Sequence, residues 1–351
     1  MKILNVIDIP WFSGVTSYAL ESSAGLAGLG HKIFFAGVRD GLPLKIALEK
    51  GFNVFEIASR KNPLIYKSFA VLKKVIDEEE IDIVNAHTGS SHFIAYLASL
   101  FTKRKFCLVR TKSDAGLPKK SFLYKHTHKV IAVSESVRKS YMNIGVLPGH
   151  VATIYQGIKI PAHSIKIPAA NYIGIIGRLD PVKGHNVFLE AASLALKRYP
   201  DAKFLIAGKE ENIKYSDLRR LAEERHIETS IQFCGFVENA RDFMERCSLG
   251  IIASLGSEAV SRVLLEWMSL GKPVVSTSVG CIPEILEKDY LVPPNDPAAL
   301  SKKMTDMIAD KNKLAAAGSR NFEIVNDRFR FENFISKTEN IFYETIKSNT
   351  Y

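Results

Sequence analysis

Two carboxylates, Glu258 and Glu266, stand eight residues apart around an apolar run. Residues 251–254 before them are typical of a buried strand, and the apolar side chains after Ser261 recur at helical spacing as far as Gly271. We therefore expect Glu258 in a loop that faces a helix N-terminus, Ser261 as the N-cap of that helix, and Glu266 inside it.

This spacing suits an elongated ligand with a phosphate in its middle. The free N–H groups of the first helical turn attract anions, and a carboxylate on each side can accept hydrogen bonds from sugar hydroxyls. An ordinary surface helix with two solvated glutamates would give the same spacing, so the pair alone leaves both interpretations open.

A second group of candidate residues lies in a loop flanked by glycines. Arg178 and Lys183 follow a predicted strand, between Gly177 and Gly184. Arginine can bind a phosphate through two parallel hydrogen bonds, lysine supplies a point charge, and the glycines allow the backbone to come close to a ligand. We interpret the loop as a diphosphate clamp; two solvated loop cations are the plainer alternative.

Strands and helices that would position these residues alternate along the whole chain. The patterns predict strands at residues 2–8, 31–37, 53–57, 81–86, 106–110, 129–133, 151–155, 172–176, 203–207, 231–234, 251–254 and 274–276, and helices at 15–29, 62–80, 91–100, 186–197, 216–225, 241–245 and 261–270, with two helices, 297–309 and 331–347, closing the chain. This alternation is typical of open, mostly parallel α/β sheets. Residues 159–170 contain two prolines and no periodicity, and we interpret them as the linker between two domains.

Further candidates in the first half follow predicted strands. His87, Thr111 and Ser134 fall at or just after the carboxyl ends of strands, which is the edge at which open α/β sheets bind ligands. Gly14, in the turn after the first strand, would let the backbone approach a ligand. A hydrogen-bonded structural histidine and a bare structural turn are the alternatives for His87 and Gly14.

The excess positive charge lies entirely in the first half of the chain. Residues 1–160 hold 22 Lys and Arg against 12 Asp and Glu, a net charge of +10, whereas the remaining residues hold 25 of each sign. Cations alternate with aromatic residues at 118–129 and cluster at 103–105. We expect this surface to bind an anionic membrane leaflet or a lipid-linked or phosphorylated glycan acceptor; an ordinary basic surface is the alternative.

The sequence also indicates a cellular location. No apolar run approaches the ~20 residues that cross a bilayer, and the first residues lead straight into a strand pattern. The four cysteines are scattered without a CxxC pair, which favours reduced thiols. We predict a cytoplasmic protein, peripheral on the inner face of the cell membrane.

Taken together, these stretches resemble the retaining glycosyltransferases of family 4, also called glycosyltransferase group 1. Glu258 and Glu266 match the family's Glu-x7-Glu motif, and residues 177–184 match its Gly-Arg-Leu…Lys-Gly loop. The other matches are residues 271–284, His87, residues 134–135 and residues 155–158. Ser13 and Gly14 stand where the family usually has two glycines, and residues 259–262 stand where many members have Gly-Phe-Gly.

The resemblance implies the fold called GT-B, an α/β fold in which two Rossmann-like α/β/α domains face each other across a cleft. It implies an N-terminal acceptor-binding domain at residues 1–163 and a nucleotide-sugar donor-binding domain at residues 171–330. A C-terminal helix within residues 331–351 would cross back and pack on the N-terminal domain.

The resemblance also implies a role for each candidate residue. Glu258 and His87 would be catalytic, with His87 facing the sugar. The donor diphosphate would be bound by Arg178, Lys183 and Gly14; the sugar and ribose by Glu258, Ala259, Val260, Ser261 and Glu266; and the base by Phe236 and Val237.

The implied reaction is a retaining transfer of a sugar to a glycan or lipid-linked acceptor, in the biosynthesis of cell-envelope polysaccharide or lipopolysaccharide. The co-substrate would be a nucleotide sugar, with a UDP-sugar favoured. We expect no cofactor and no metal, because no DxD-like motif is present and Arg178, Lys183 and helix N-termini can stabilise the departing diphosphate.

Three other functions fit the sequence less well. A nucleotide-sugar epimerase of the same fold would use the donor without an acceptor. A non-catalytic basic protein would bind nucleic acid or another polyanion, but the two glutamates would repel a phosphate backbone, so we expect no nucleic-acid partner. A dinucleotide-dependent dehydrogenase is disfavoured because no GxGxxG follows the first strand.

Overall fold

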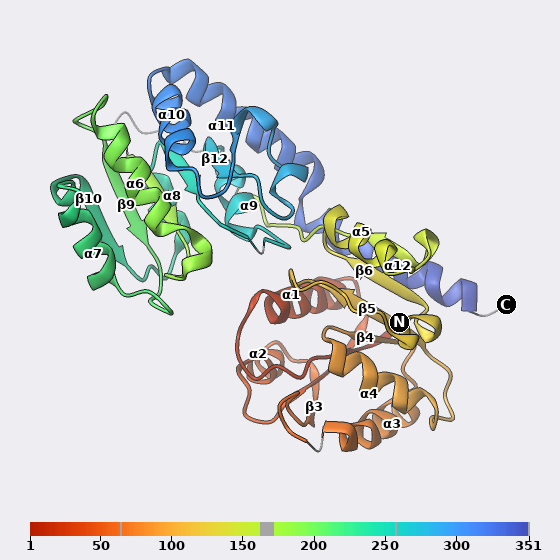
Figure 1. The fold of residues 1–351 in the computed structure, drawn as a ribbon. Helices are drawn as coiled ribbons and strands as arrows, with labels where there is room; N and C mark the ends of the chain where they lie inside the picture. Colours follow the sequence, from red (N-terminus) through yellow and green to blue (C-terminus); the bar gives the residue numbers. More distant parts are fainter. Residues whose placement is uncertain (64, 162–171, 257, 350–351) are drawn as a thin grey trace. The chain divides into compact units, whose positions relative to one another are not determined.

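Each half of the chain folds into a parallel sheet with helices packed against it (Figure 1). The computed structural model describes residues 1–63, 65–161, 172–256 and 258–349. The predicted linker, 159–170, lies mostly outside the described residues.

The chain divides into two units. The first, unit 1, comprises Met1–Gly157 together with Phe331–Tyr351, and the second, unit 2, comprises Ile158–Arg330. Each unit has its own hydrophobic core. The end of the chain therefore belongs to the unit with which the chain begins.

The sheet of unit 1 has the strand order β3-β2-β1-β4-β5-β6-β7, and its described pairings are all parallel. Its strands are β1 (Lys2–Val6), β2 (Lys32–Val38), β3 (Asn53–Ile57), β4 (Ile83–Ala86), β5 (Cys107–Lys112), β6 (Lys129–Ala132) and β7 (Val151–Thr153). A parallel sheet covered by helices buries both faces, which explains why these strands are nearly continuous apolar runs. The order reverses between β1 and β4, so the loops after these two strands diverge to opposite faces of the sheet.

Helices cover both faces of this sheet. They are α1 (Gly14–Gly28), α2 (Leu42–Glu49), α3 (Ser68–Glu78), α4 (Gly89–Ser99), α5 (Glu135–Asn143) and α12 (Phe331–Asn349), with short 3-10 helices η1 (Ile65–Lys67), η2 (Phe122–His126) and η3 (Pro148–His150). Side chains of α3 and α4 share a core with Leu4 and Leu108. The next residue of β1, Asn5, points to the other face and donates to Ser23 of α1.

The last helix, α12, packs on α1 and β5 of unit 1. The ring of Phe334 lies edge-on to that of Tyr18, with 5.1 Å between the ring centroids. Glu339 pairs with His31 at 2.7 Å, and the Cys107 thiol of β5 contacts the carbonyl oxygen of Thr345. The expectation that the last helix returns to the first domain is confirmed.

The sheet of unit 2 has the order β10-β9-β8-β11-β12-β13, again parallel in its described pairings. Its strands are β8 (Tyr172–Ile176), β9 (Lys203–Ala207), β10 (Ile231–Gly235), β11 (Leu249–Ile252), β12 (Val274–Thr277) and β13 (Leu291–Val292). Its helices are α6 (His185–Leu196), α7 (Tyr215–Glu224), α8 (Ala240–Arg246), α9 (Arg262–Ser269), α10 (Pro297–Ile308) and α11 (Lys311–Arg328), with 3-10 helices η4 (Pro181–Lys183), η5 (Glu228–Ser230), η6 (Ile282–Glu284) and η7 (Lys288–Tyr290). The core lies between the sheet and helices that include α6 and α10.

The predicted parallel α/β series is confirmed, but several elements differ from the prediction. Helices α2, α5 and α11 and strand β13 were not predicted, so three helices close the chain rather than two. Helix α5 buries only Val137 and Tyr141, and α11 is rich in alanine and charge, so neither shows a strong apolar stripe. The helix predicted from residue 62 begins at Ser68, because Pro63 disfavours helical backbone in the residue before it.

Truncating a buried side chain of α12 is expected to destabilise unit 1. Phe342 is fully buried, so Phe342→Ala should lower the free energy of unfolding by about 3–5 kcal/mol through lost apolar contact and the cavity left behind. Glu344, two residues further on, is exposed, and Glu344→Ala is the matched control with little expected effect. Urea denaturation would measure both variants; equal effects would contradict the packing of α12 on unit 1.

Candidate active site

Three loops meet at one edge of the sheet of unit 2. Strands β8, β11 and β12 are parallel neighbours, so their carboxyl ends lie at the same edge. The chain leaves β8 toward β9 on one side and returns as β11 on the other, which makes the β8–β11 boundary the topological switch point. Open α/β sheets bind ligands in the crevice at such a point.

A glycine brings the loop after β8 against the loop after β11. Gly184 has a φ of +69°, which other residues rarely adopt, and a Cβ atom there would lie 1.9 Å from the carbonyl oxygen of Ala253. The backbone N–H of Leu255 donates to the carbonyl of Val182 at 2.8 Å. No side chain fits at position 184 without separating these loops.

A second glycine brings in the loop after β12. Gly280 has a φ of +55°, and a Cβ atom there would lie 2.1 Å from the carbonyl oxygen of Glu258. The N–H of Cys281 donates to that same carbonyl at 2.8 Å. Glu258 is therefore held by its backbone to one neighbouring loop, and its side chain points to the other.

The carboxylate of Glu258 is buried and paired. Its Oε1 accepts from Lys183 Nζ at 2.6 Å and from the Ser254 hydroxyl at 2.7 Å. The side chain of Glu258 is 6% exposed, while that of Lys183 is 26% exposed. The solvated-glutamate alternative is wrong for Glu258, since a carboxylate this deeply buried depends on its cation and its hydroxyl donor. Lys183 keeps a solvent-facing part with which to meet an anion.

The other predicted phosphate ligand, Arg178, has a different partner. Its side chain is 58% exposed and pairs with Glu211 in the segment after β9. The structure thus pairs Lys183 with Glu258 and Arg178 with a separate carboxylate, Glu211; the clamp formed by the two cations on a diphosphate stays a prediction.

Helix α9 carries Glu266 and begins just after the Glu258 loop. Glu266 accepts from Arg262 Nε at 2.9 Å and is partly exposed, while Ala259 and Ser261 are buried and Val260 is half-buried. Ser261 stands at the N-cap as predicted, but its side chain makes no capping hydrogen bond, so that part of the prediction is wrong. Because no side chain caps this helix, the N–H groups of its first turn can donate to a bound anion.

The predicted base-binding residues follow β10, at the edge of the same sheet. Gly235 has a positive φ of +72° and turns the chain outward. The Phe236 ring is 67% exposed, and Val237 is half-buried. An exposed aromatic ring can stack on a flat base, so both residues remain candidates.

His87 lies in unit 1, directly after β4. Its ring is fully buried, and Nε2 is within 3.0 Å of the Asn5 side-chain oxygen. Burial, with a smaller contribution from the Arg110 charge, lowers the pKa of His87 to about 3, so the ring is neutral at pH 7. This placement favours the structural alternative; its predicted contact with the sugar stays a prediction.

The three remaining candidates of unit 1 are Thr111, Ser134 and Gly14. Thr111 donates to the Asn85 side chain at 2.7 Å, and Ser134 caps α5. Gly14 is the first residue of α1, whose N-cap Ser13 forms a capping box with Thr16. A Cβ atom at Gly14 would have nothing within 4 Å, so the space beside it is open to a ligand.

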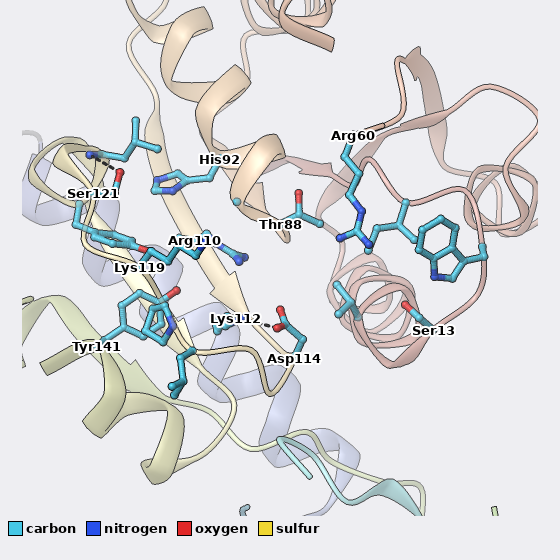
Figure 2. Close-up of a pocket in the computed structure, with 18 residues that line it drawn as sticks. Ser13, Arg60, Thr88, His92, Arg110, Lys112, Asp114, Lys119, Ser121 and Tyr141 are labelled. Atoms are coloured by element: carbon cyan, nitrogen blue, oxygen red, sulfur yellow. Dashed lines mark hydrogen bonds and ion pairs between the residues drawn. The ribbon is translucent and has the colours of Figure 1, made fainter. Parts of the chain in front are cut away.

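The described part of unit 1 also contains a pocket of about 600 Å³ (Figure 2). Its lining includes Ser13 after β1, Thr88 after β4, and two cations of β5, Arg110 and Lys112. Sequence reasoning missed this pair. Their alternation with Leu108 along one strand places them on one face of the sheet, and that period of two was the available signal.

Two family models match the chain. The one described as Glycosyltransferase Family 4 matches residues 12–160, and the one described as Glycosyl transferases group 1 matches residues 170–310. The chain belongs to glycosyltransferase family 4.

Named relatives agree with membership of family 4. The gpi3 subunit of phosphatidylinositol N-acetylglucosaminyltransferase from Schizosaccharomyces pombe is 27% identical, over 97% of this chain and 79% of its own. N-acetyl-alpha-D-glucosaminyl L-malate synthase from Bacillus anthracis is 24% identical, over 96% of this chain and 97% of its own.

Solved structures give the fold of this family 4 glycosyltransferase. The Anabaena protein HepE in complex with UDP superposes with a TM-score of 0.84 at 19% identity, covering 98% of this chain and 100% of its own. The expected GT-B fold is confirmed. Because family 4 proteins are transferases, the non-catalytic alternative is set aside.

Replacing His87 should make the free energy of unfolding fall less steeply as the pH is lowered. Its pKa is about 3 in the folded chain against the usual 6.5, so between these values the unfolded chain takes up a proton that the folded chain does not. Stability from this residue is full above pH 6.5 and falls as pH drops toward 3, by about 1.4 kcal/mol per pH unit. The melting temperature of His87→Asn, measured from about pH 7.5 to about pH 4.5, should therefore fall less steeply than that of the wild type.

The exposed His126 supplies the control, because His126→Asn should keep the wild-type slope. A wild-type slope in His87→Asn as well would contradict a buried, neutral imidazole.

Proposed function

We propose that this enzyme transfers a sugar, with retention of configuration, from a nucleotide-sugar donor to a hydroxyl of a glycan or lipid-linked acceptor. The observation that carries the proposal is the junction of three loops around the Lys183–Glu258 pair at the switch point of unit 2. It puts a partly exposed cation, a buried carboxylate and a helix N-terminus at one sheet edge, which are the groups that a sugar diphosphate requires.

Relatives support the choice of donor. The two named relatives transfer N-acetylglucosaminyl groups according to their names, and HepE has been solved with UDP and with UDP-glucose. We therefore propose a UDP-sugar as the donor. We keep the predicted roles: Lys183, Arg178 and Gly14 for the diphosphate, Glu258 and residues 259–261 for the sugar, Glu266 for the ribose, and Phe236 and Val237 for the base.

The proposed catalysis is electrostatic. As the sugar–phosphate bond breaks, negative charge grows on the departing diphosphate, where Lys183 and the first-turn N–H groups of α9 can stabilise it. Glu258 fixes the position of Lys183 through their contact and keeps its carboxylate at the sugar subsite. The acceptor hydroxyl would attack from the face that the diphosphate leaves, and the diphosphate would take the hydroxyl proton.

The donor site is tested with UDP-, GDP- and ADP-sugars offered with and without acceptor extracts. We expect one donor to raise the melting temperature of the wild type and to be consumed with retention of anomeric configuration, read by NMR. Glu258→Gln keeps the side-chain shape but removes the charge that faces Lys183, and should lower turnover about 10²–10³-fold.

The control for this variant is Glu190→Gln, an exposed residue on α6 that should leave turnover unchanged. Full turnover in Glu258→Gln would refute its role. Interconversion of the donor sugar without transfer would instead favour an epimerase.

We also propose that unit 1 attaches to an anionic membrane surface, as expected of an enzyme of cell-envelope polysaccharide or lipopolysaccharide synthesis. None of the helices in the described ranges has the length and apolarity to span a bilayer. Exposed apolar and basic side chains occur in the segment after α4, in the segment before η2 and on η2 itself: Leu100, Phe101, Lys103, Lys105, Leu117, Lys119, Lys120, Phe122 and Lys125. The Phe122 ring contacts Tyr96 of α4, with 5.5 Å between centroids, so η2 lies beside α4.

Vesicle flotation tests this attachment. The bound fraction should rise with the content of anionic lipid and fall with added salt. Phe122→Ser should weaken binding about tenfold through lost apolar burial, whereas Leu147→Ser, at an exposed apolar position elsewhere in unit 1, should not. Binding that ignores both lipid charge and Phe122 would contradict the proposal.

A further inference from the structure

Arg110 is a buried cation of the pocket in unit 1. It lies on β5 and is 4% exposed. Its Nη1 donates to the backbone carbonyl oxygens of Ala86 and Thr111, and among the described residues no carboxylate forms an ion pair with it. Burying a guanidinium costs several kcal/mol when no opposite charge compensates it. An uncompensated buried cation destabilises the folded chain, which suggests that a bound anionic ligand compensates the charge of Arg110.

The pocket that Arg110 lines is positively charged. Its charged lining residues are Arg60, Arg110, Lys112, Lys119 and Asp114, four cations against one carboxylate, a net charge of +3. Asp114 already pairs with Lys112, so it does not neutralise Arg110. In Figure 2 Thr88 is drawn between Arg60 and Arg110, and the Arg60 guanidinium lies over the Trp11 ring, 5.3 Å from its centroid.

Histidine adds no charge to this pocket. His92 also lines it, but burial first and the Arg110 charge second lower the pKa of His92 to about 3. Its Nε2 is within 2.8 Å of the Thr127 hydroxyl. The excess charge of the pocket is therefore carried by arginine and lysine side chains.

The remaining lining suits a hydroxylated ring. Hydroxyl groups of Ser13, Thr88 and Ser121 and rings of Trp11, Tyr124 and Tyr141 surround about 600 Å³. A pocket of this volume can enclose one sugar or polyol ring together with an anionic substituent. Aromatic rings contact the faces of such a ring, and hydroxyl groups bond its edges.

We infer that this pocket binds an acceptor that carries a phosphate or a carboxylate, and that Arg110 binds the anionic group, with Lys119 at the pocket rim. The inference rests on the proposed function, because it names the acceptor class of the same reaction. Arg110 can donate two parallel hydrogen bonds to either anion. The proposed cationic ligands of the donor diphosphate, Lys183 and Arg178, belong to unit 2, whereas Gly14 of unit 1 is proposed to meet that diphosphate through its backbone alone.

Calorimetric titration of the full chain with glycerol 3-phosphate, lactate and neutral glycerol tests the inference. We expect one or both anions to bind and glycerol not to bind. Arg110→Gln should weaken anion binding about 10–100-fold, the effect of losing charge-assisted hydrogen bonds. Glycerol 3-phosphate against lactate tells whether the group is a phosphate or a carboxylate.

A second variant covers the case in which Arg110→Gln fails to fold. Lys119 is exposed and lines the pocket, whereas its neighbour Lys120 is exposed and does not appear in the lining. Lys119→Gln should weaken anion binding about threefold to tenfold, and Lys120→Gln should leave it unchanged. Binding that is equally strong in Arg110→Gln, Lys119→Gln and Lys120→Gln would overturn the inference.

A lipid-borne anion is distinguished by a vesicle arm. Phosphatidylcholine vesicles with and without phosphatidic acid are offered to the same variants. Both lysines belong to the proposed membrane-binding surface, but only Lys119 lines the pocket. A larger loss in Lys119→Gln than in Lys120→Gln that is seen only on phosphatidic-acid vesicles would therefore assign the anion to a lipid headgroup. No anion binding in either arm overturns the inference. If UDP still raises the melting temperature of these samples, only the acceptor class fails; if UDP does not, the donor site fails too.

Discussion

The contact between Lys183 and Glu258 is the interaction on which the proposed donor site depends. A buried carboxylate needs a cation and a hydrogen-bond donor, and here Lys183 and Ser254 supply them. The contact forms only if the loops after β8 and β11 touch, and they touch because position 184 has no side chain. The ion pair between Lys183 and Glu258 therefore depends on the glycine at position 184, which sets the path of the backbone.

Both units place polar groups at the same kind of sheet edge but balance their charges differently. In unit 2 a cation meets a carboxylate inside the protein. In unit 1 the loops after β1 and β4 line a pocket in which Arg110 donates to two backbone carbonyl oxygens and, within the part of the chain that the structure describes, forms no ion pair. His87, directly after β4, is buried, and its hydrogen bond to Asn5 links it to β1.

Much of the fold could be predicted because parallel strands are buried on both faces, and such strands are apolar wherever they occur. Strands β8 and β9 were predicted with the bounds that the structure has. Helix α5 was missed because it buries only two side chains. Helix α11 buries one face at helical spacing, but Gly318 and Asn321 interrupt the apolar pattern on that face, and alanines and charged residues surround it. The spacing of the two glutamates left open whether Glu258 is solvated or belongs to a binding site. Its burial and its ion pair with Lys183 show that it is not solvated.

The site was only partly predictable, because side-chain partners depend on residues distant in sequence. The loop motif named Arg178 and Lys183 together, yet Glu211, 33 residues away, holds Arg178. The sequence shows Arg110 and Lys112 as two cations in an apolar strand. That no carboxylate among the described residues pairs with Arg110 is known only from the structure, because such a partner could come from any part of the chain.

The central claim is that the three loops joined through Glu258 form the donor diphosphate site. Hydrogen exchange, followed by mass spectrometry with and without a saturating nucleotide sugar, tests it most directly. We predict that the donor slows amide exchange in residues 177–184, 258–265 and 278–284, with smaller changes in the rest of unit 2. If no nucleotide sugar slows exchange in these loops, or if slowing occurs only elsewhere in the chain, the claim is wrong.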